Sequence, residues 1–115
     1  MRGEIGDKER LGHIFDCIRE IADATNGVTK EAFEENHVLR IAVVKWLEII
    51  GEAANNVTET TKGKTSDVPW KKIIGFRHYD VHEYFGIDFM IVWKLVTDDL
   101  PDLEQTVSKL LKEYE

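Results

Sequence analysis

The sequence has little of several residue types, and each shortage excludes a class of protein. Its 115 residues include one cysteine, Cys17, which excludes an intrachain disulfide and a zinc site built from cysteines. The longest purely apolar run, 89–93, has five residues, whereas a helix needs about 20 to span a bilayer. Residues 1–5 contain no apolar signal region. We therefore expect a cytoplasmic protein without a membrane span, in which Cys17 is a small buried hydrophobe.

Positive charge is also scarce. The chain has 15 Lys and Arg against 22 Asp and Glu, which gives a net charge of −7. A protein that binds nucleic acid through bulk charge usually has a basic surface, so the composition counts against that mode of binding. A local basic cleft is still possible, because Lys71, Lys72 and Arg77 are close in sequence, and Arg40 and Lys45 lie on an otherwise apolar segment.

Proline is also rare, with two residues in the chain. The alternation of apolar and polar residues that is typical of strands is rare as well. Apolar residues instead recur at intervals of three and four, which indicates helices. Apolar residues make up 43% and charged residues 32%, as in a folded globular protein. We predict a single all-α domain over residues 1–115, an antiparallel bundle of four to six helices.

Local signals give the expected helix boundaries. A first helix with an apolar stripe should end at Asn26-Gly27, and Thr29 should cap a short helix to about Glu35. A long helix should follow over about 37–57, and then a loop over 58–68. Pro69 should begin the next helix, which Gly86 stops. Asp88 should cap a further helix, and Pro101 should open or kink the last one.

The segment 37–57 is apolar around most of its helical circumference. One buried stripe cannot account for this, so we expect the helix to be buried on more than one side. In a chain of this length the second side predicts a subunit interface, and a two-fold homodimer is the commonest arrangement.

The segment 77–84 concentrates side chains that handle phosphate. Arg77 stays charged and presents a planar fork of donors, while His78 and His82 can exchange protons near neutral pH. Tyr84 adds a hydroxyl and a ring that could stack on a base. Cleavage of a phosphodiester can use such a set.

The spacing of Arg77, four residues, His82, one residue and Tyr84 resembles the motif of the HEPN superfamily. The HepT-like branch of this superfamily is also resembled by three further runs, 47–54, 69–76 and 85–88. In all, the resemblance extends from about Lys8 to the C-terminus. This resemblance implies a small cytoplasmic toxin with metal-independent endoribonuclease activity. It also implies a nucleotidyltransferase antitoxin of the MntA type, a composite cleft at a dimer interface, and Tyr84 as the residue that the antitoxin adenylylates.

The chemistry of such a cleft assigns roles to the motif residues. We expect His82 to be the acid or base and Arg77 to stabilise charge on the phosphate. His78 stands where the HepT-like branch usually has a polar residue, most often asparagine, so the division of labour between His78 and His82 stays open. No cofactor is needed.

Helix geometry leaves the assembly of the site open. On an ideal helix Arg77 and Tyr84 share nearly one face, but His82 is rotated from Arg77 by about 140°. Either the last turn before Gly86 unwinds, or His82 of one chain completes the pocket of a second chain.

Several residues have simpler interpretations. Arg77 could pair with Asp80 or Glu83 at a solvated helix end, and Tyr79 is expected to pack. The four-residue spacing of His78 and His82 suits a two-histidine metal site, but without a third ligand we predict no metal.

Outside the motif, Glu48 and Glu52 could pair with Arg40, Lys45 or Arg77, and a structural role in holding Arg77 is the favoured one. His13 and His37 imply no site. The three tryptophans should anchor the core and interfaces; they are Trp46, Trp70 and Trp93.

A non-catalytic module belongs to a different class of function. It would use the same cleft to bind a nucleotide or to dock a nucleotidyltransferase, and the acidic net charge favours it. The complete set of Arg77, His82 and Tyr84 favours the enzyme.

Overall fold

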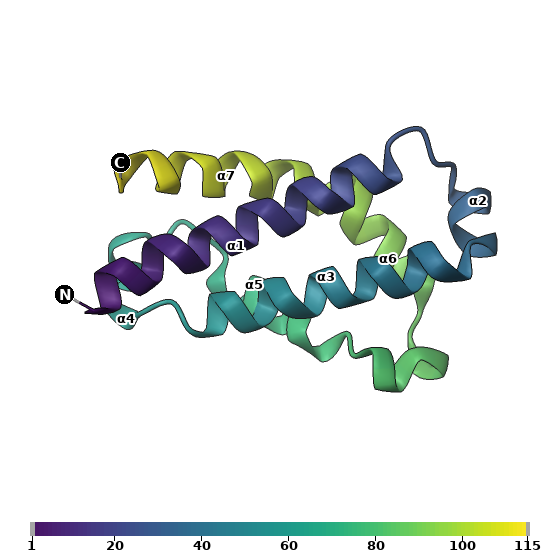
Figure 1. The fold of residues 1–115 in the computed structure, drawn as a ribbon, viewed down its shortest axis with the longest axis horizontal. Helices are drawn as coiled ribbons and strands as arrows, with labels where there is room; N and C mark the ends of the chain where they lie inside the picture. The colour runs from purple at the N-terminus through teal and green to yellow at the C-terminus, as the bar shows by residue number, and fades with distance from the viewer. Residues whose placement is uncertain (1, 115) are drawn as a thin grey trace.

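The computed structural model describes the backbone of residues 2–114 and the side chains from residue 6 to residue 114. Residues 1–5, for which we predicted no apolar signal region, lie outside the described side chains. Every regular element of the described chain is a helix, which confirms the all-α prediction (Figure 1). Its elements in order are α1 (Arg2–Thr25), α2 (Lys30–Glu35), α3 (His37–Asn55), α4 (Glu59–Lys64), α5 (Trp70–Ile74), the 3₁₀-helices η1 (Gly75–His78) and η2 (Val81–Gly86), α6 (Phe89–Lys94), the π-helical turn η3 (Leu95–Asp99) and α7 (Leu100–Glu113).

Three long helices form the body of the domain. Figure 1 shows α1 between α7 and α3, with its direction opposite to both, so that the start of α1 and the end of α7 lie at the same end of the bundle. The predicted antiparallel bundle is therefore confirmed. Among the described helices, none has both the length and the apolar character that a membrane crossing requires.

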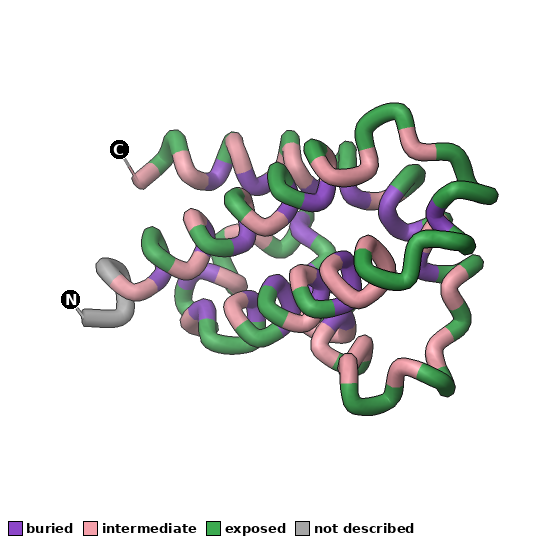
Figure 2. The backbone as a smooth tube through the Cα atoms, turned by 45° about the vertical axis from the view of Figure 1, so that its right-hand side comes forward, coloured by how far each residue is buried: buried purple, intermediate pink, exposed green. Residues whose placement is uncertain are grey.

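The core lies between these helices and α5 (Figure 2). α3 contacts α1 on one side, and α5 and η1 on another, and its buried residues are Val43, Val44, Leu47, Ile50, Gly51 and Ala54. The expectation that this helix is buried on more than one side is confirmed. However, the second side is covered by the chain's own α5 and η1, so the apolar circumference of α3 does not by itself indicate a subunit interface.

Several helix ends agree with the sequence prediction. Gly27 has a φ of 74°, the left-handed conformation expected after α1. The Thr29 hydroxyl accepts a hydrogen bond from the Ala32 amide at 3.1 Å, and Asp88 accepts one from the Met90 amide at 3.0 Å. Pro101 lies in the first turn of α7, where its missing N–H does no harm.

Two single residues of the core were also anticipated. Trp70 is buried, and its indole nitrogen donates to the Thr65 hydroxyl at 3.0 Å. Cys17 is half-buried against the core, and burial, followed by the charges of Glu20 and Asp16, raises its pKa to about 11. The thiol is therefore protonated and unreactive at neutral pH.

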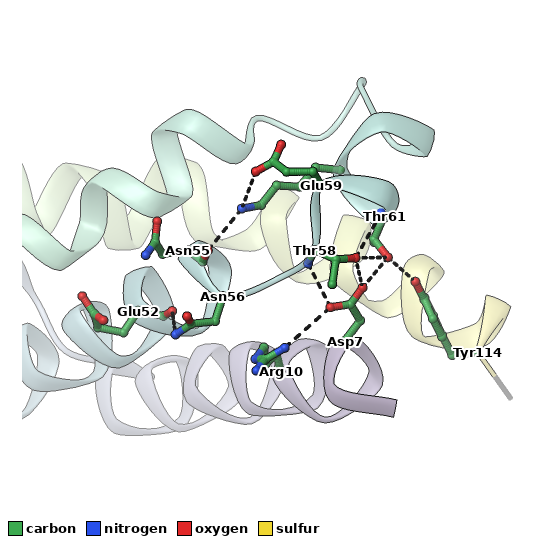
Figure 3. Close-up of polar contacts among 10 residues, drawn as sticks. Asp7, Arg10, Glu52, Asn55, Asn56, Thr58, Glu59, Thr61 and Tyr114 are labelled. Carbon is green, nitrogen blue, oxygen red and sulfur yellow. Dashed lines mark hydrogen bonds and ion pairs between the residues drawn. The ribbon is translucent and has the colours of Figure 1, made fainter. Parts of the chain in front are cut away.

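The predicted loop over 58–68 is wrong, because it contains α4. The described residues therefore hold seven α-helices and not four to six. Asp7, 1% exposed, accepts hydrogen bonds from the Thr58 amide at 3.0 Å and the Thr58 hydroxyl at 2.6 Å (Figure 3). The Thr61 hydroxyl also donates to Asp7, and it contacts the Tyr114 hydroxyl at 2.8 Å. These contacts with α1 and α7 fix a helix whose own sequence has little helical preference.

Replacing Asp7 with Asn should destabilise the fold by about 1–3 kcal/mol, because the Thr58 and Thr61 donors lose their charged acceptor. Burial alone would raise the pKa of Asp7, but hydrogen bonds from Thr58 and Thr61 and the charge of Arg10 outweigh it and lower the pKa. The stabilisation should be complete above about pH 4 and disappear as the pH falls through the folded-state pKa.

Urea denaturation of the wild type and of Asp7→Asn at several pH values measures this difference. Asp16→Asn, an exposed position on α1, is the matched control and should leave stability unchanged. A difference between the Asp7 variant and the wild type that stays constant from pH 7 to below the folded-state pKa would contradict the assigned role.

Candidate functional site

The segment that carries the motif is not one helix, and the prediction of a single helix from Pro69 to Gly86 is wrong. α5 ends at Ile74, and the backbone between η1 and η2 is extended at Tyr79 (φ −80°, ψ 101°) and Asp80 (φ −118°, ψ 129°). The Asp80 carboxylate accepts the His82 amide at 2.8 Å, which is the donor that a continuous helix would direct to the carbonyl of His78. This side chain therefore starts a new turn and breaks the helix.

A close backbone contact fixes the first half of the segment on α3. Gly51 of α3 is buried, and a Cβ atom there would lie 2.3 Å from the Arg77 backbone nitrogen. Only a residue without a side chain permits this approach. The Arg77 guanidinium nitrogen Nη1 then lies 3.7 Å from Oε1 of Glu52, so Glu52 holds Arg77 as expected, and Asp80 and Glu83 do not.

The opposite half of the segment contacts the beginning of α3. The Tyr84 hydroxyl lies 2.8 Å from Nδ1 of His37, and their rings meet edge to face at 4.9 Å. The guanidinium carbon of Arg40 lies 5.9 Å from the centre of the Tyr84 ring and 5.1 Å from that of Phe89. Sequence reasoning missed His37, whose Nδ1 contacts the Tyr84 hydroxyl.

Of the three motif residues Arg77, His82 and Tyr84, His82 is the most exposed. Its side chain is 87% exposed, and its Nδ1 lies 2.8 Å from Oδ1 of Asp80. The His82 amide and imidazole, together with the charge of Lys45 on α3, lower the pKa of Asp80. An anionic carboxylate thus adjoins an exposed imidazole.

The motif residues are therefore spread along α3 and not gathered. The contact residues of Tyr84 and Arg77 on α3, His37 and Glu52, are 15 residues apart, which is about 22 Å of helix. The shared helical face expected for Arg77 and Tyr84 is wrong, because the break at Tyr79 and Asp80 removes it. Figure 2 shows how this part of the chain runs along the outside of the bundle, and η2 contains no buried residue.

The break also separates the two motif histidines. His78 belongs to η1 and His82 to η2, so they do not have the one-turn geometry of a two-histidine metal site. Among the residues whose side chains are described, no three His, Cys, Asp or Glu residues form a group that could hold a metal ion. Tyr79 packs against the core as expected, and burial, followed by the charges of Asp88 and Asp99, raises its pKa.

The second acidic residue of α3 also has a basic partner. Glu48 lies 3.7 Å from Lys45, as one of the expected pairings required. Arg40 pairs with neither Glu48 nor Glu52 but donates to the carbonyl of Glu34. The structural interpretation of these charges is therefore confirmed, and Asp80 is the residue of the segment whose contact the sequence did not reveal.

Comparison with known sequences identifies the family of the chain. The sequence model of the family described as "Ribonuclease HepT-like" matches residues 14–110, a range that includes the whole motif and α3. The chain belongs to this family. Because the HepT-like match covers most of the chain, the resemblance of the motif and its flanking runs to this branch is confirmed.

Individual HepT-like relatives match over nearly their full length. A protein of Caldanaerobacter subterraneus named "Putative RNase" is 38% identical over 102 residues, which cover 89% of this chain and 91% of the relative. A protein of Thermococcus cleftensis named "Probable ribonuclease HepT" is 34% identical over 105 residues, covering 91% and 96%. No solved structure gives a significant match.

Replacing Gly51 with Ala should displace η1 from α3, because the new methyl group meets the Arg77 backbone. We expect a loss of about 1–3 kcal/mol in stability and altered amide resonances across residues 75–84, measured by denaturation and NMR. Gly12→Ala on α1 is the matched control, since a Cβ atom there has nothing within 4 Å. Unchanged resonances in the Gly51 variant would contradict the contact.

Proposed function

We propose that this protein is a metal-independent endoribonuclease, the toxin of a bacterial or archaeal toxin–antitoxin pair. The observation that carries the proposal is the position of His82, a strongly exposed imidazole beside a carboxylate within a motif that the HepT-like match spans completely. An exposed imidazole can reach a substrate, and histidine is the side chain best suited to exchange protons near neutral pH.

The proposed reaction divides between two residues. His82 takes the proton from a ribose 2′-OH, the 2′ oxygen bonds to the adjacent phosphorus, and the bond to the 5′ oxygen breaks as that oxygen takes a proton from water or from the imidazolium of His82. The products are a cyclic phosphate and a 5′-hydroxyl. Arg77 stabilises the negative charge that develops on the phosphate. Acid–base catalysis of this kind contributes typically about 10² to 10⁴-fold in rate.

We propose further that two chains form the active unit. Within the described chain Arg77 and Tyr84 contact opposite parts of α3, so a second copy is needed to bring more motif residues to one phosphate. Large apolar side chains around η2 are exposed, Phe85 by 98%, Val38 by 76% and Ile91 by 55%, and a partner would cover them.

A mixture of inactive Arg77→Ala and His82→Ala chains should regain cleavage, and no recovery would contradict a shared site.

The proposed regulation acts on Tyr84. A nucleotidyltransferase antitoxin of the MntA type would transfer an adenylyl group to its hydroxyl and so place a bulky anion beside the RNA site. The contacts of Tyr84 support this role, because its hydroxyl lies near the surface at His37 and the guanidinium of Arg40 lies over its ring. A guanidinium is suited to a phosphodiester.

Purified, unmodified protein should cleave RNA in the presence of EDTA and leave cyclic phosphate ends. His82→Ala should reduce the rate by about 10²-fold or more while leaving the fold intact, because the side chain is exposed and Asp80 is its one hydrogen-bonding partner among the residues that the structure describes. Cleavage is measured on structured and single-stranded RNAs, with circular dichroism as the folding control. If neither form cleaves, the non-catalytic binding module replaces the enzyme; if both cleave equally, the role of His82 is wrong.

Incubation with ATP and an active cognate antitoxin should add one or more adenylyl masses at Tyr84 and abolish cleavage. The chain has three tyrosines, and Tyr114 is held by Thr61 at the other end of the domain. Tyr84→Phe should therefore block the mass increase, and Tyr114→Phe should leave it unchanged. Modification that persists in the Tyr84 variant, or none with an active antitoxin, would remove this model of regulation.

A further inference from the structure

The imidazole of His82 is held on one side only. Oδ1 of Asp80 lies 2.8 Å from the backbone nitrogen of His82 and 2.8 Å from its Nδ1. The Asp80 side chain is 39% exposed and the imidazole 87%, so the anchoring group lies on the protein side of the pair. Nε2 is consequently the nitrogen that remains for a ligand.

The charge of Asp80 determines which nitrogen carries the proton. An ionised carboxylate only accepts hydrogen bonds, so both groups that approach Oδ1 must donate. The pKa of Asp80 is lowered by the His82 amide and imidazole, and Lys45 of α3 adds to this effect, so the carboxylate is ionised at neutral pH. Nδ1 must then carry the proton, and in a neutral imidazole Nε2 carries the lone pair.

We propose that Asp80 is a positioning residue for the reaction: it holds His82 in the Nδ1-protonated form, so that Nε2 accepts the proton of the RNA 2′-OH. This inference rests on the proposed ribonuclease function. Asp80 does not take up the proton itself but fixes the ring orientation and stabilises the imidazolium that forms, as carboxylates do beside other catalytic histidines.

The same contact distinguishes the two motif histidines. In the described part of the chain, His82 has a carboxylate within hydrogen-bond distance of its ring, whereas no such partner is found for His78. The orienting group that a general base requires is thus supplied to His82. The contact with Asp80 therefore favours His82 over His78 as the base.

A simpler role for Asp80 would be to cap η2 through the His82 amide alone. Asp80→Ser separates the two roles, because a serine can still accept the amide hydrogen but is too short and uncharged to hold the imidazole. Asp80→Asn keeps the shape and both acceptor contacts but removes the charge. Asp88→Ser is the matched control, since Asp88 caps α6 through the Met90 amide with the same spacing.

We expect Asp80→Ser to melt like the wild type and to lower kcat on the order of 10- to 100-fold with little change in KM, as when other partners of a functional histidine are removed. Asp80→Asn should lose less, and Asp88→Ser nothing. In ¹⁵N NMR at a pH where the ring is neutral, His82 should be protonated at Nδ1 in the wild type and should shift toward Nε2 protonation in Asp80→Ser.

Two readouts keep the outcomes separate. If the wild type cleaves, His82→Ala does not, and Asp80→Ser cleaves at the wild-type rate, the positioning role fails while the ribonuclease stands. An unchanged His82 tautomer in Asp80→Ser would overturn the role in the same way. If the wild type cleaves no RNA, the proposed function fails, and the catalytic role of Asp80 fails with it.

Discussion

The backbone of Arg77 lies directly on Gly51, and the arrangement of the whole motif depends on that contact. It brings η1 onto α3 at a distance that no side chain at position 51 would permit. From there the chain can only continue along the outside of α3 toward its beginning, where Tyr84 reaches His37. The break at Asp80 allows this path, because a straight helix would have turned the second half of the motif away from α3.

The same contact explains why α3 is apolar over so much of its surface. A helix at the edge of a bundle needs one apolar stripe, but α3 is covered by α1 on one side and by α5 and η1 on another. The core and the site therefore use one helix in common. Its buried residues, such as Val44 and Leu47, hold the bundle together, while polar residues of its exposed turns, Lys45 and Glu52, approach the motif.

Local sequence rules predicted those parts of the fold that local interactions determine. Gly27, Thr29 and Asp88 act on neighbours within three residues, so their effects could be inferred from the sequence alone. α4 could not be inferred, because the group that fixes it is Asp7, more than 50 residues away. Tertiary contacts of this kind override weak local preference.

The candidate site could likewise be predicted only in part from the sequence. The residue types Arg77, His82 and Tyr84 indicated the chemistry proposed above, and the pairing of Arg77 with Glu52 was expected from the charges of α3. The partners Asp80 and His37 were missed for different reasons. His37 is 47 residues from Tyr84, so no spacing rule connects them. Asp80 is only two residues from His82, and an aspartate that accepts the amide two residues later is a known signal of a turn that could have revealed the break.

This layout bears on how one short motif could serve both cleavage and its control. If the three residues lay in one compact pocket, a group attached to Tyr84 would have to occupy the place of the reacting phosphate. Here the hydroxyl of Tyr84 and the guanidinium of Arg77 contact parts of α3 about 22 Å apart along its axis. Under the proposed function, a modified Tyr84 would therefore obstruct the path of an RNA strand along α3, or its access to the proposed partner chain, without occupying the place of Arg77 in its own chain. The exposed ring of Phe85 beside Tyr84 lies at that same place, so one event there would affect both substrate and partner.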